Sequence, residues 1–143
     1  MEPISSKCVC TALRMTTRTV KSAYDQELAP AGLTQTSYTI LSRLEDEGPF
    51  AISELADRLA MDRTTCSREL RPLLTAGHAE QAVGQDRRQR IITLTPAGRR
   101  QLEIARPRWQ TAQQKISQAF GTQRASGLLA ELHDLLRSAS ALT

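Results

Sequence analysis

Apolar positions recur at helical spacing over the first third of the chain. Residues 7–29 carry apolar or small side chains three and four positions apart, which predicts one long amphipathic helix that ends before Pro30. A second helix is predicted over Gln35–Glu47, with Thr34 as its N-cap and Gly48 after its last residue. Its inward face holds Tyr38, Leu41 and Leu44.

Two shorter helices are predicted next, over residues 53–59 and 61–77, with a tight turn at 60–62 between them. Asp62 suits the N-cap of the second helix because its carboxylate accepts a hydrogen bond from a free backbone N–H. Gly77 suits its end because glycine adopts the left-handed conformation easily. A helix, a short turn and a helix that begins with polar residues form the helix-turn-helix pattern. An ordinary packed helical hairpin produces the same pattern, so the motif alone leaves both interpretations open.

The first turns of the helix over 61–77 collect short hydroxyls and long guanidiniums, which reach base edges and phosphates in a DNA groove. The candidate DNA-binding residues on this helix are Thr64, Thr65, Ser67, Arg68 and Arg71. Pro72 lacks the N–H that would bond the Arg68 carbonyl, so we expect a bend after the DNA-reading turns.

Two candidate strands, at 80–83 and Arg90–Leu94, follow this pair of helices. A charged turn at 84–89 joins them, which predicts the β-hairpin wing of a winged helix, and a short strand at 50–52 can pair with it. Arginine is favoured near phosphates and in a narrow minor groove, and the candidate contacts on the wing are Arg87, Arg88 and Arg90. We expect Asp86 to hold a neighbouring arginine rather than to contact DNA. A solvated charge run is the alternative, which the placement of arginines on both candidate DNA elements disfavours.

The rest of the chain predicts two more helices. Thr95 and Pro96 suit the N-cap and first residue of a helix that runs towards Phe120, with a kink at Pro107. The last helix, over 123–138, has a wide apolar stripe formed by Leu128, Leu129, Leu132, Leu135 and Leu136. This is more apolar surface than a terminal helix of a small monomer needs, so we expect it to pack against a twin helix in a homodimer. Packing against the first helix of the same chain is the alternative.

The predicted fold class is therefore mainly α with a small β-wing. One domain over 1–143 divides into a winged helix-turn-helix DNA-binding lobe at 34–96 and a helical dimerisation unit that both chain ends form, at 1–33 and 97–143. In such a dimer the two recognition helices lie about one DNA turn apart, roughly 34–36 Å, and read a pseudo-palindrome.

This order of elements resembles the multiple antibiotic resistance regulator (MarR) family of winged-helix repressors over nearly the whole chain. The most specific motifs are Asp-Arg-Arg at 86–88 in the wing and Leu-Thr-Pro-Ala-Gly at 94–98. The resemblance implies a dimeric, sequence-specific transcriptional regulator that an input signal releases from a double-stranded DNA operator. The segment from Cys10 to Tyr24 further resembles the first helix of the organic hydroperoxide regulators. Cys10 matches their sensing cysteine and Tyr24 one of two tyrosines that hydrogen-bond it, while Arg14 replaces the other tyrosine.

Composition agrees with a globular protein that has a polyanionic partner. The 143 residues are 40% apolar and 24% charged, and the formal charge of +4 doubles to +8 in a dimer. No apolar run approaches a membrane span, and residues 1–7 lack the apolar core of a signal peptide. We therefore expect a cytoplasmic protein with no membrane partner, whose three cysteines remain thiols in a reducing compartment.

The best candidate for the input signal is oxidation of a thiol at the start of the first helix. A cysteine near a helix N-terminus gains thiolate character from the helix dipole, and Lys7 adds to it at Cys10. Peroxide converts a thiolate to a sulfenic acid, which a second thiol can trap. Cys8 is the nearest second thiol in sequence, although positions i and i+2 of one helix point apart. Cys66, in the recognition helix, is expected to be inert packing.

Other inputs remain open. Cys10 can instead be a small buried apolar residue, with a small-molecule effector bound between the dimerisation helices and the DNA lobe, where Arg14, Arg18, Tyr38 and Trp109 are candidate lining residues. Two Cys-x-Cys pairs across a dimer suit a soft metal ion less well, and we expect neither metal nor cofactor. A thiol-dependent enzyme and a winged helix used only for protein contacts are the competing classes. The chain has no Cys-x-x-Cys, Ser-His-Asp arrangement, phosphate loop or zinc-ligand spacing, so no enzyme is expected.

Overall fold

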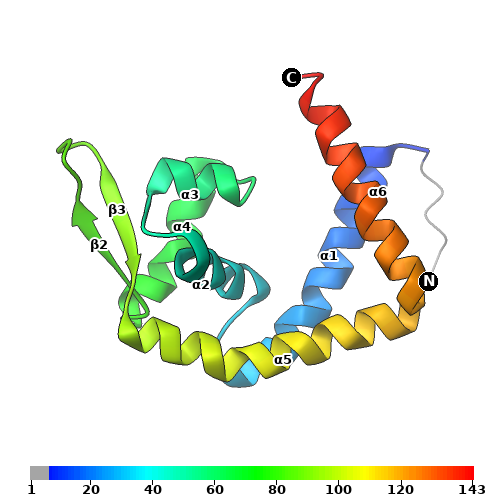
Figure 1. Cartoon of the computed structure of the whole chain (residues 1–143), viewed down its shortest axis with the longest axis horizontal. Helices are drawn as coiled ribbons and strands as arrows, with labels where there is room; N and C mark the ends of the chain where they lie inside the picture. Colours follow the sequence, from blue (N-terminus) through cyan, green and yellow to red (C-terminus); the bar gives the residue numbers. More distant parts are fainter. Residues whose placement is uncertain (1–6) are drawn as a thin grey trace.

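The computed structural model of the chain describes residues 7–143 and shows a mainly helical molecule with one small sheet (Figure 1). In chain order its elements are α1 (Val9–Leu28), the 3₁₀ turn η1 (Ala29–Ala31), α2 (Gln35–Glu47), β1 (Phe50–Ala51), α3 (Ile52–Arg58), α4 (Arg63–Thr75), β2 (Ala79–Val83), β3 (Arg90–Leu94), α5 (Pro96–Phe120) and α6 (Thr122–Ser140). These elements confirm the predicted fold class, and their ends lie within two residues of the predicted ones. The first six residues of the proposed dimerisation segment 1–33 lie outside the described residues.

The molecule is extended, with two groups of elements at its ends (Figure 1). α2, α3, α4 and the β2–β3 hairpin form one group, α1 and α6 form the other, and α5 runs along one side from the first group to the second. The sheet is antiparallel in the order β1-β3-β2, with Phe50 opposite Ile92 and Val83 opposite Arg90. Both candidate DNA elements therefore lie at one end of the molecule, and the leucine-rich helix lies at the other.

Local sequence explains where the helices begin. The Thr34 hydroxyl accepts a hydrogen bond from the Ser37 N–H at 3.1 Å, and the Ser37 hydroxyl accepts one from the Thr34 N–H at 2.8 Å, which makes a capping box for α2. Thr95 caps α5 in the same way, accepting from the Gly98 N–H at 3.0 Å. These bonds satisfy donors that have no partner inside the helix. The predicted caps of α2 and α5 are confirmed.

One aliphatic core joins the helices to the sheet. Its largest fully buried side chains are Leu28, Ile40, Leu41, Leu55, Cys66, Leu70, Ile92 and Leu102. They come from α1, α2, α3, α4, β3 and α5, so each of these elements buries an apolar face against the others. α4 continues through Pro72 and α5 through Pro107, and Figure 1 shows α5 as one long, bowed helix.

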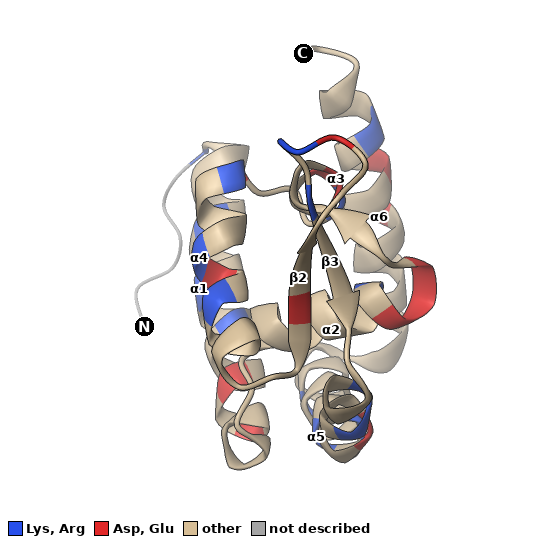
Figure 2. Ribbon diagram, turned by 90° about the vertical axis from the view of Figure 1, so that its left-hand side faces the viewer, with Lys and Arg blue, Asp and Glu red and all other residues tan. Residues whose placement is uncertain are grey.

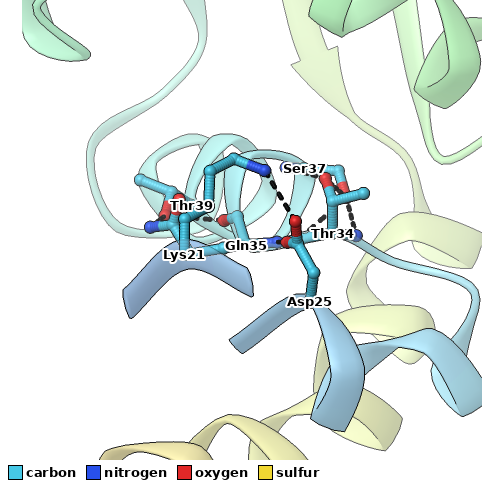
Figure 3. A network of polar contacts seen from close by, with 6 residues as sticks. All are labelled: Lys21, Asp25, Thr34, Gln35, Ser37 and Thr39. Carbon is cyan, nitrogen blue, oxygen red and sulfur yellow. Dashed lines mark hydrogen bonds and ion pairs between the residues drawn. The ribbon is translucent and has the colours of Figure 1, made fainter. Parts of the chain in front are cut away.

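The end of α1 is tied to the beginning of α2 by a small polar network (Figure 3). The Asp25 carboxylate accepts a hydrogen bond from the backbone N–H of Gln35 at 2.7 Å and pairs with Lys21 Nζ at 2.8 Å. A carboxylate is favoured there because the N-terminus of a helix carries partial positive charge. The network links the first helix of the chain directly to the helix-turn-helix lobe.

α6 buries none of its residues within the chain. Leu128, Leu129, Leu135 and Leu136 are 43%, 48%, 39% and 63% exposed. α6 overlaps α1 in Figure 1, but Figure 2, turned by 90°, draws the two helices apart. Leu132 is half-buried, so packing within the described part of the chain covers the stripe only in part and leaves its other four leucines exposed.

Gly98, in the first turn of α5, tests the junction between the wing and α5. A Cβ at this position would lie 1.9 Å from the backbone carbonyl oxygen of His78. We expect Gly98→Ala to lower the free energy of unfolding by about 1–3 kcal/mol, because backbone must move to admit the methyl group. Urea denaturation at fixed protein concentration measures it. The control is Gly127→Ala in α6, where a Cβ meets nothing within 4 Å and helix propensity predicts a gain of about 0.5–1 kcal/mol. Equal stability of Gly98→Ala and wild type would contradict this packing.

Candidate nucleic-acid interface

The turn between α3 and α4 sets the direction of the recognition helix. Ala60 adopts a left-handed backbone conformation with φ of 52°, and the Met61 N–H donates to the Ala56 carbonyl at 2.9 Å. Just after the C-terminal end of α4, Gly77 has φ of 76°, the left-handed conformation that its predicted role at the end of this helix requires. The helix-turn-helix interpretation of the sequence thus has the expected geometry.

Asp62 caps α4 through both carboxylate oxygens. Oδ1 accepts a hydrogen bond from the Thr65 backbone N–H at 2.7 Å, and Oδ2 accepts one from the Thr65 hydroxyl at 2.9 Å. These two bonds, with a smaller contribution from the charge of Arg68, hold the pKa of Asp62 below its ordinary value. The first turn of α4 therefore carries a fixed negative charge beside exposed basic side chains.

The two faces of α4 separate apolar from polar side chains. Cys66, Leu70 and Leu73 are buried in the core. The candidate DNA-reading side chains Thr64, Ser67, Arg68 and Arg71 are exposed, and Thr65 is half-buried. Burial of one face of α4 leaves the predicted set on or beside the opposite face, as a helix that enters a DNA groove requires.

The three arginines of the wing differ in what they contact: one bonds the wing loop itself, and two are exposed to solvent. The Gly84 N–H donates to the Gln89 carbonyl at 3.1 Å and closes the loop. The Arg90 guanidinium donates to the carbonyls of Arg87 and Gln89 at 3.0 and 3.3 Å, so it stabilises the loop from within. Arg87 and Arg88 are exposed, and Figure 2 shows basic segments at the tip of the wing.

Asp86 holds the neighbouring Arg88, as expected, but through the backbone N–H of that residue rather than through its guanidinium. The Asp86 carboxylate accepts a hydrogen bond from the backbone N–H of Arg88 at 3.0 Å, and its carbonyl accepts one from the Gln89 N–H at 2.9 Å. Short aspartate side chains favour such bonds two residues along a turn over contact with a long, solvated guanidinium. Asp86 therefore shapes the loop through the backbone, which leaves the Arg88 side chain without a partner among the described residues.

The two thiols at the start of α1 are both exposed in the single chain. Cys8 is the N-cap of α1 and has an extended backbone, with φ of −85° and ψ of 114°. Hydrogen bonds from the side chain and backbone of Thr11 lower the pKa of the Cys8 thiol. Cys66 is fully buried, and desolvation raises its pKa, in line with its predicted role as packing.

Tyr24 does not lie beside Cys10 in the chain. The two residues are fourteen positions apart on α1, or about 21 Å along its axis. The Tyr24 hydroxyl instead donates to Gln113 of α5, and burial raises the pKa of this tyrosine. A tyrosine–cysteine contact of the kind that the hydroperoxide regulators suggest therefore requires a second protomer.

The four residues proposed to line an effector pocket fall into two separate environments. Tyr38 of α2 stacks on Trp109 of α5, with ring centroids 5.7 Å apart and planes 9° from parallel. Arg14 and Arg18 are exposed on α1, and Arg18 borders a shallow depression formed by α1 alone. The sequence placed these residues by helical face only, and the structure does not bring the two arginines to the aromatic pair. A cavity of about 150 Å³ lies elsewhere, between the beginning of α2 and the end of α4.

Sequence reasoning missed the partners that connect α1 and α2 to α5. Glu45 of α2 pairs with Arg106 at 3.0 Å and with Arg99 at 3.6 Å. Glu27 of α1 pairs with Lys115. Isolated charges on helix surfaces are common, so no pattern in the sequence distinguishes these from solvated ones.

Residues 7–143 contain neither a candidate metal site nor a helix that could cross a membrane. No group of three or more His, Cys, Asp and Glu side chains is placed to hold a metal ion. None of the helices combines the length and apolar character needed to cross a bilayer.

Comparison with known proteins assigns the family. A family model described as the MarR family matches residues 31–89. The transcriptional regulator MosR of M. tuberculosis, solved in complex with DNA, is 31% identical, with 92% of this chain and 99% of that chain covered and a TM-score of 0.74. The chain belongs to the MarR family. It is thus a MarR-type transcriptional regulator, and its α3–α4 unit and β2–β3 hairpin are the helix-turn-helix and wing of a DNA-binding lobe.

Two further proteins are similar to this MarR-type regulator, one in fold and one in sequence. The repressor CouR, solved with a 23-mer DNA duplex, is 23% identical with a TM-score of 0.82, over 95% of this chain and 99% of that chain. The HTH-type transcriptional regulator YwoH of Bacillus subtilis is 23% identical over 91 residues. That match spans 64% of this chain and 66% of YwoH, just under two thirds of its length.

The exposed wing arginine Arg88 provides a test of phosphate contact. We expect Arg88→Ala to weaken binding to all DNA sequences and to reduce the salt slope of log K by about 0.9, because each neutralised phosphate releases close to one counterion. Fluorescence anisotropy at several salt concentrations measures both quantities. Arg108→Ala, an equal loss of charge at an exposed position of α5, should leave the slope unchanged. The same slope for Arg88→Ala and wild type would exclude a phosphate contact for this side chain.

Proposed function

We propose that this MarR-type regulator is a homodimeric repressor that binds a pseudo-palindromic operator and that oxidation of Cys8 and Cys10 releases it. The arrangement of α4 and the wing is the observation that supports operator binding. One end of the molecule presents a capped helix with exposed hydroxyls and guanidiniums beside a hairpin with free arginines. α4 enters the major groove, where Arg68 and the neighbouring hydroxyls meet base edges, and the wing lies along the adjacent phosphates.

The dimer is supported by the apolar surface at the opposite end. α6 leaves four of its leucines exposed, and Val9, Leu13 and Met15 of α1 are 59%, 37% and 47% exposed. Removal of such surface from water contributes roughly 25 cal/mol per Å². A second copy of this end covers both helices and holds the two α4 helices at a set separation, so that both half-sites of an operator are met at once.

The contacts of α1 and α5 supply a route from the dimer end to the DNA lobe. Asp25 joins α1 to the first turn of α2, Tyr24 joins α1 to α5 through Gln113, and Glu45 joins α2 to α5. A displacement of α1 therefore moves the DNA lobe with it. A small shift is sufficient because the distance between two half-sites is fixed by the DNA.

The proposed input is an organic peroxide that oxidises the two thiols. The Cys10 sulfur attacks the outer oxygen of the peroxide, a sulfur–oxygen bond forms as the O–O bond breaks, and the leaving alkoxide takes up the proton that the thiol gives and departs as the alcohol. The Cys8 thiolate then attacks the resulting sulfenic sulfur, a disulfide forms, and water leaves. The two thiols lose two electrons and the peroxide gains them, and an added dithiol returns them. Cys8 is an N-cap with an extended backbone rather than a helical residue, so only the first turn of α1 must open to bring the sulfurs together.

A non-covalent effector is the second candidate input, favoured by one observation. Arg14 and Arg18 are exposed one turn apart on α1 and have no partner among residues 7–143. Two neighbouring guanidiniums suit a carboxylate ligand such as an aromatic acid. Binding there would act on the same helix as oxidation of the thiols.

The apolar stripe of α6 tests the dimer. We expect Leu129→Glu with Leu136→Glu to give a folded monomer, because both side chains are exposed in the single chain, whose core contains no α6 residue, and two charges oppose burial at the interface. Sedimentation should show the change in mass, and affinity for the full operator should fall by at least tenfold. The control is His133→Glu, an exposed polar position on the same helix. A folded monomer with wild-type operator affinity would contradict the dimer model.

Substitution of the three cysteines tests whether thiol oxidation releases the protein from DNA. Organic peroxide should release wild-type protein from operator DNA, a dithiol should restore binding, and peptide mass analysis should show a Cys8–Cys10 disulfide. Cys8→Ser and Cys10→Ser should bind DNA and ignore peroxide, whereas Cys66→Ser, at a buried thiol, should respond as wild type does. Release of Cys10→Ser by the same peroxide would remove this thiol from the mechanism. A wild-type protein that ignores peroxide but leaves DNA with an aromatic acid would favour the second input.

A further inference from the structure

The Thr65 hydroxyl in the first turn of α4 has its single hydrogen committed inside the protein. Its oxygen lies 2.9 Å from Asp62 Oδ2. The Asp62 side chain is an ionised carboxylate and has no hydrogen to give, so the hydroxyl must be the donor in this bond. Oδ1 simultaneously accepts from the Thr65 N–H at 2.7 Å, which fixes the plane of the carboxylate.

This commitment limits what Thr65 can do at a DNA surface. A free hydroxyl offers one donor and two acceptor sites, but here only the acceptor sites remain. Phosphate oxygens, guanine O6 and N7, and thymine O4 are all acceptors and cannot pair with it. In the major groove the donors are the exocyclic amino groups, N4 of cytosine and N6 of adenine.

We infer that Asp62 and Thr65 form an acceptor unit that reads an exocyclic amino group of cytosine or adenine in each operator half-site. Thr65 contacts the base, and Asp62 is a positioning residue that sets the direction of the hydroxyl. The inference rests on the proposed placement of α4 in the major groove and adds the chemical class of base at one position.

Arg68, on the same side of α4, can contact the base next to the one that Thr65 contacts. It lies three residues after Thr65, so the two side chains are neighbours on the α4 surface. Its charge is close enough to Asp62 to act on that carboxylate. A guanidinium donates to guanine O6 and N7. An acceptor beside a two-pronged donor matches a guanine next to an amino-bearing base.

Selection of bound sequences from random DNA tests the inference with four proteins. Wild type should select a half-site with cytosine or adenine at one position beside a guanine. Thr65→Val, which removes the hydroxyl but keeps the backbone N–H, should lose the preference at that position alone and bind the wild-type site roughly two- to tenfold more weakly. Thr75→Val, the same change at the exposed far end of α4, should leave the selected sequence unchanged.

Asp62→Asn tests the direction of the hydrogen bond. Asparagine is as good an N-cap as aspartate, so its carbonyl oxygen can keep the bond from the Thr65 N–H. Its amide nitrogen then takes the place of Oδ2 and donates to the hydroxyl, which turns the Thr65 hydrogen outward. The preference at the same position should extend to guanine and thymine. Circular dichroism and thermal unfolding confirm that each variant is folded.

The outcomes separate this inference from the proposed function. A wild-type protein that selects no sequence would overturn both. A clear wild-type half-site that Thr65→Val selects unchanged, or that it binds with a uniform loss on all sequences, would overturn the acceptor role of Thr65. An Asp62→Asn protein that keeps the strict cytosine or adenine preference would overturn the role of Asp62.

Discussion

The packing of α1 against α5 is the interaction on which the rest of the structure depends. Leu28, Leu102 and Ala105 are fully buried where these helices meet the core of the DNA lobe. Farther along, the bond from Tyr24 to Gln113 and the ion pair of Glu27 with Lys115 join the two helices. Because α5 reaches from the wing to α6 (Figure 1), this helix pair determines where the DNA lobe lies relative to the leucine-rich end.

The two ends of the molecule are exposed for different physical reasons. At the DNA end, the exposed side chains of α4 and the wing are mostly polar or basic, with Val83 as the large apolar exception, and water solvates the polar ones. At the other end, α6 and the first turns of α1 expose leucine, valine and methionine, which water does not favour. The first surface is stable in a free protein, whereas the second calls for a partner with the same character.

The proposed sensing thiols and the proposed DNA-binding surface are far apart in the molecule, and only helices connect them. Cys8 and Cys10 are at the outer end of α1, and the network around Asp25 is at its inner end, next to α2. A rigid helix transmits a displacement over this length without any change along the way. The charge of Asp62, in contrast, acts locally: it holds the first turn of α4 and the hydroxyl of Thr65.

The sequence by itself determined the elements, and only the tertiary structure decided the partners. Helical and strand periodicity, the caps Thr34, Asp62 and Thr95, and the arginine-rich turn are local signals, so they predicted the fold class and the DNA-binding face from nearby residues alone.

Partners distant in sequence leave no such signal. Nothing in the sequence indicated that Tyr24 bonds Gln113, and the pattern that grouped Tyr38 with Trp109 did not show that the two rings stack on each other. The direction of single side chains was equally hidden, since Asp86 bonds a backbone N–H and Arg90 bonds carbonyls of its own loop. Backbone hydrogen bonding and periodicity act over a few residues, while the choice of side-chain partner depends on how whole helices meet.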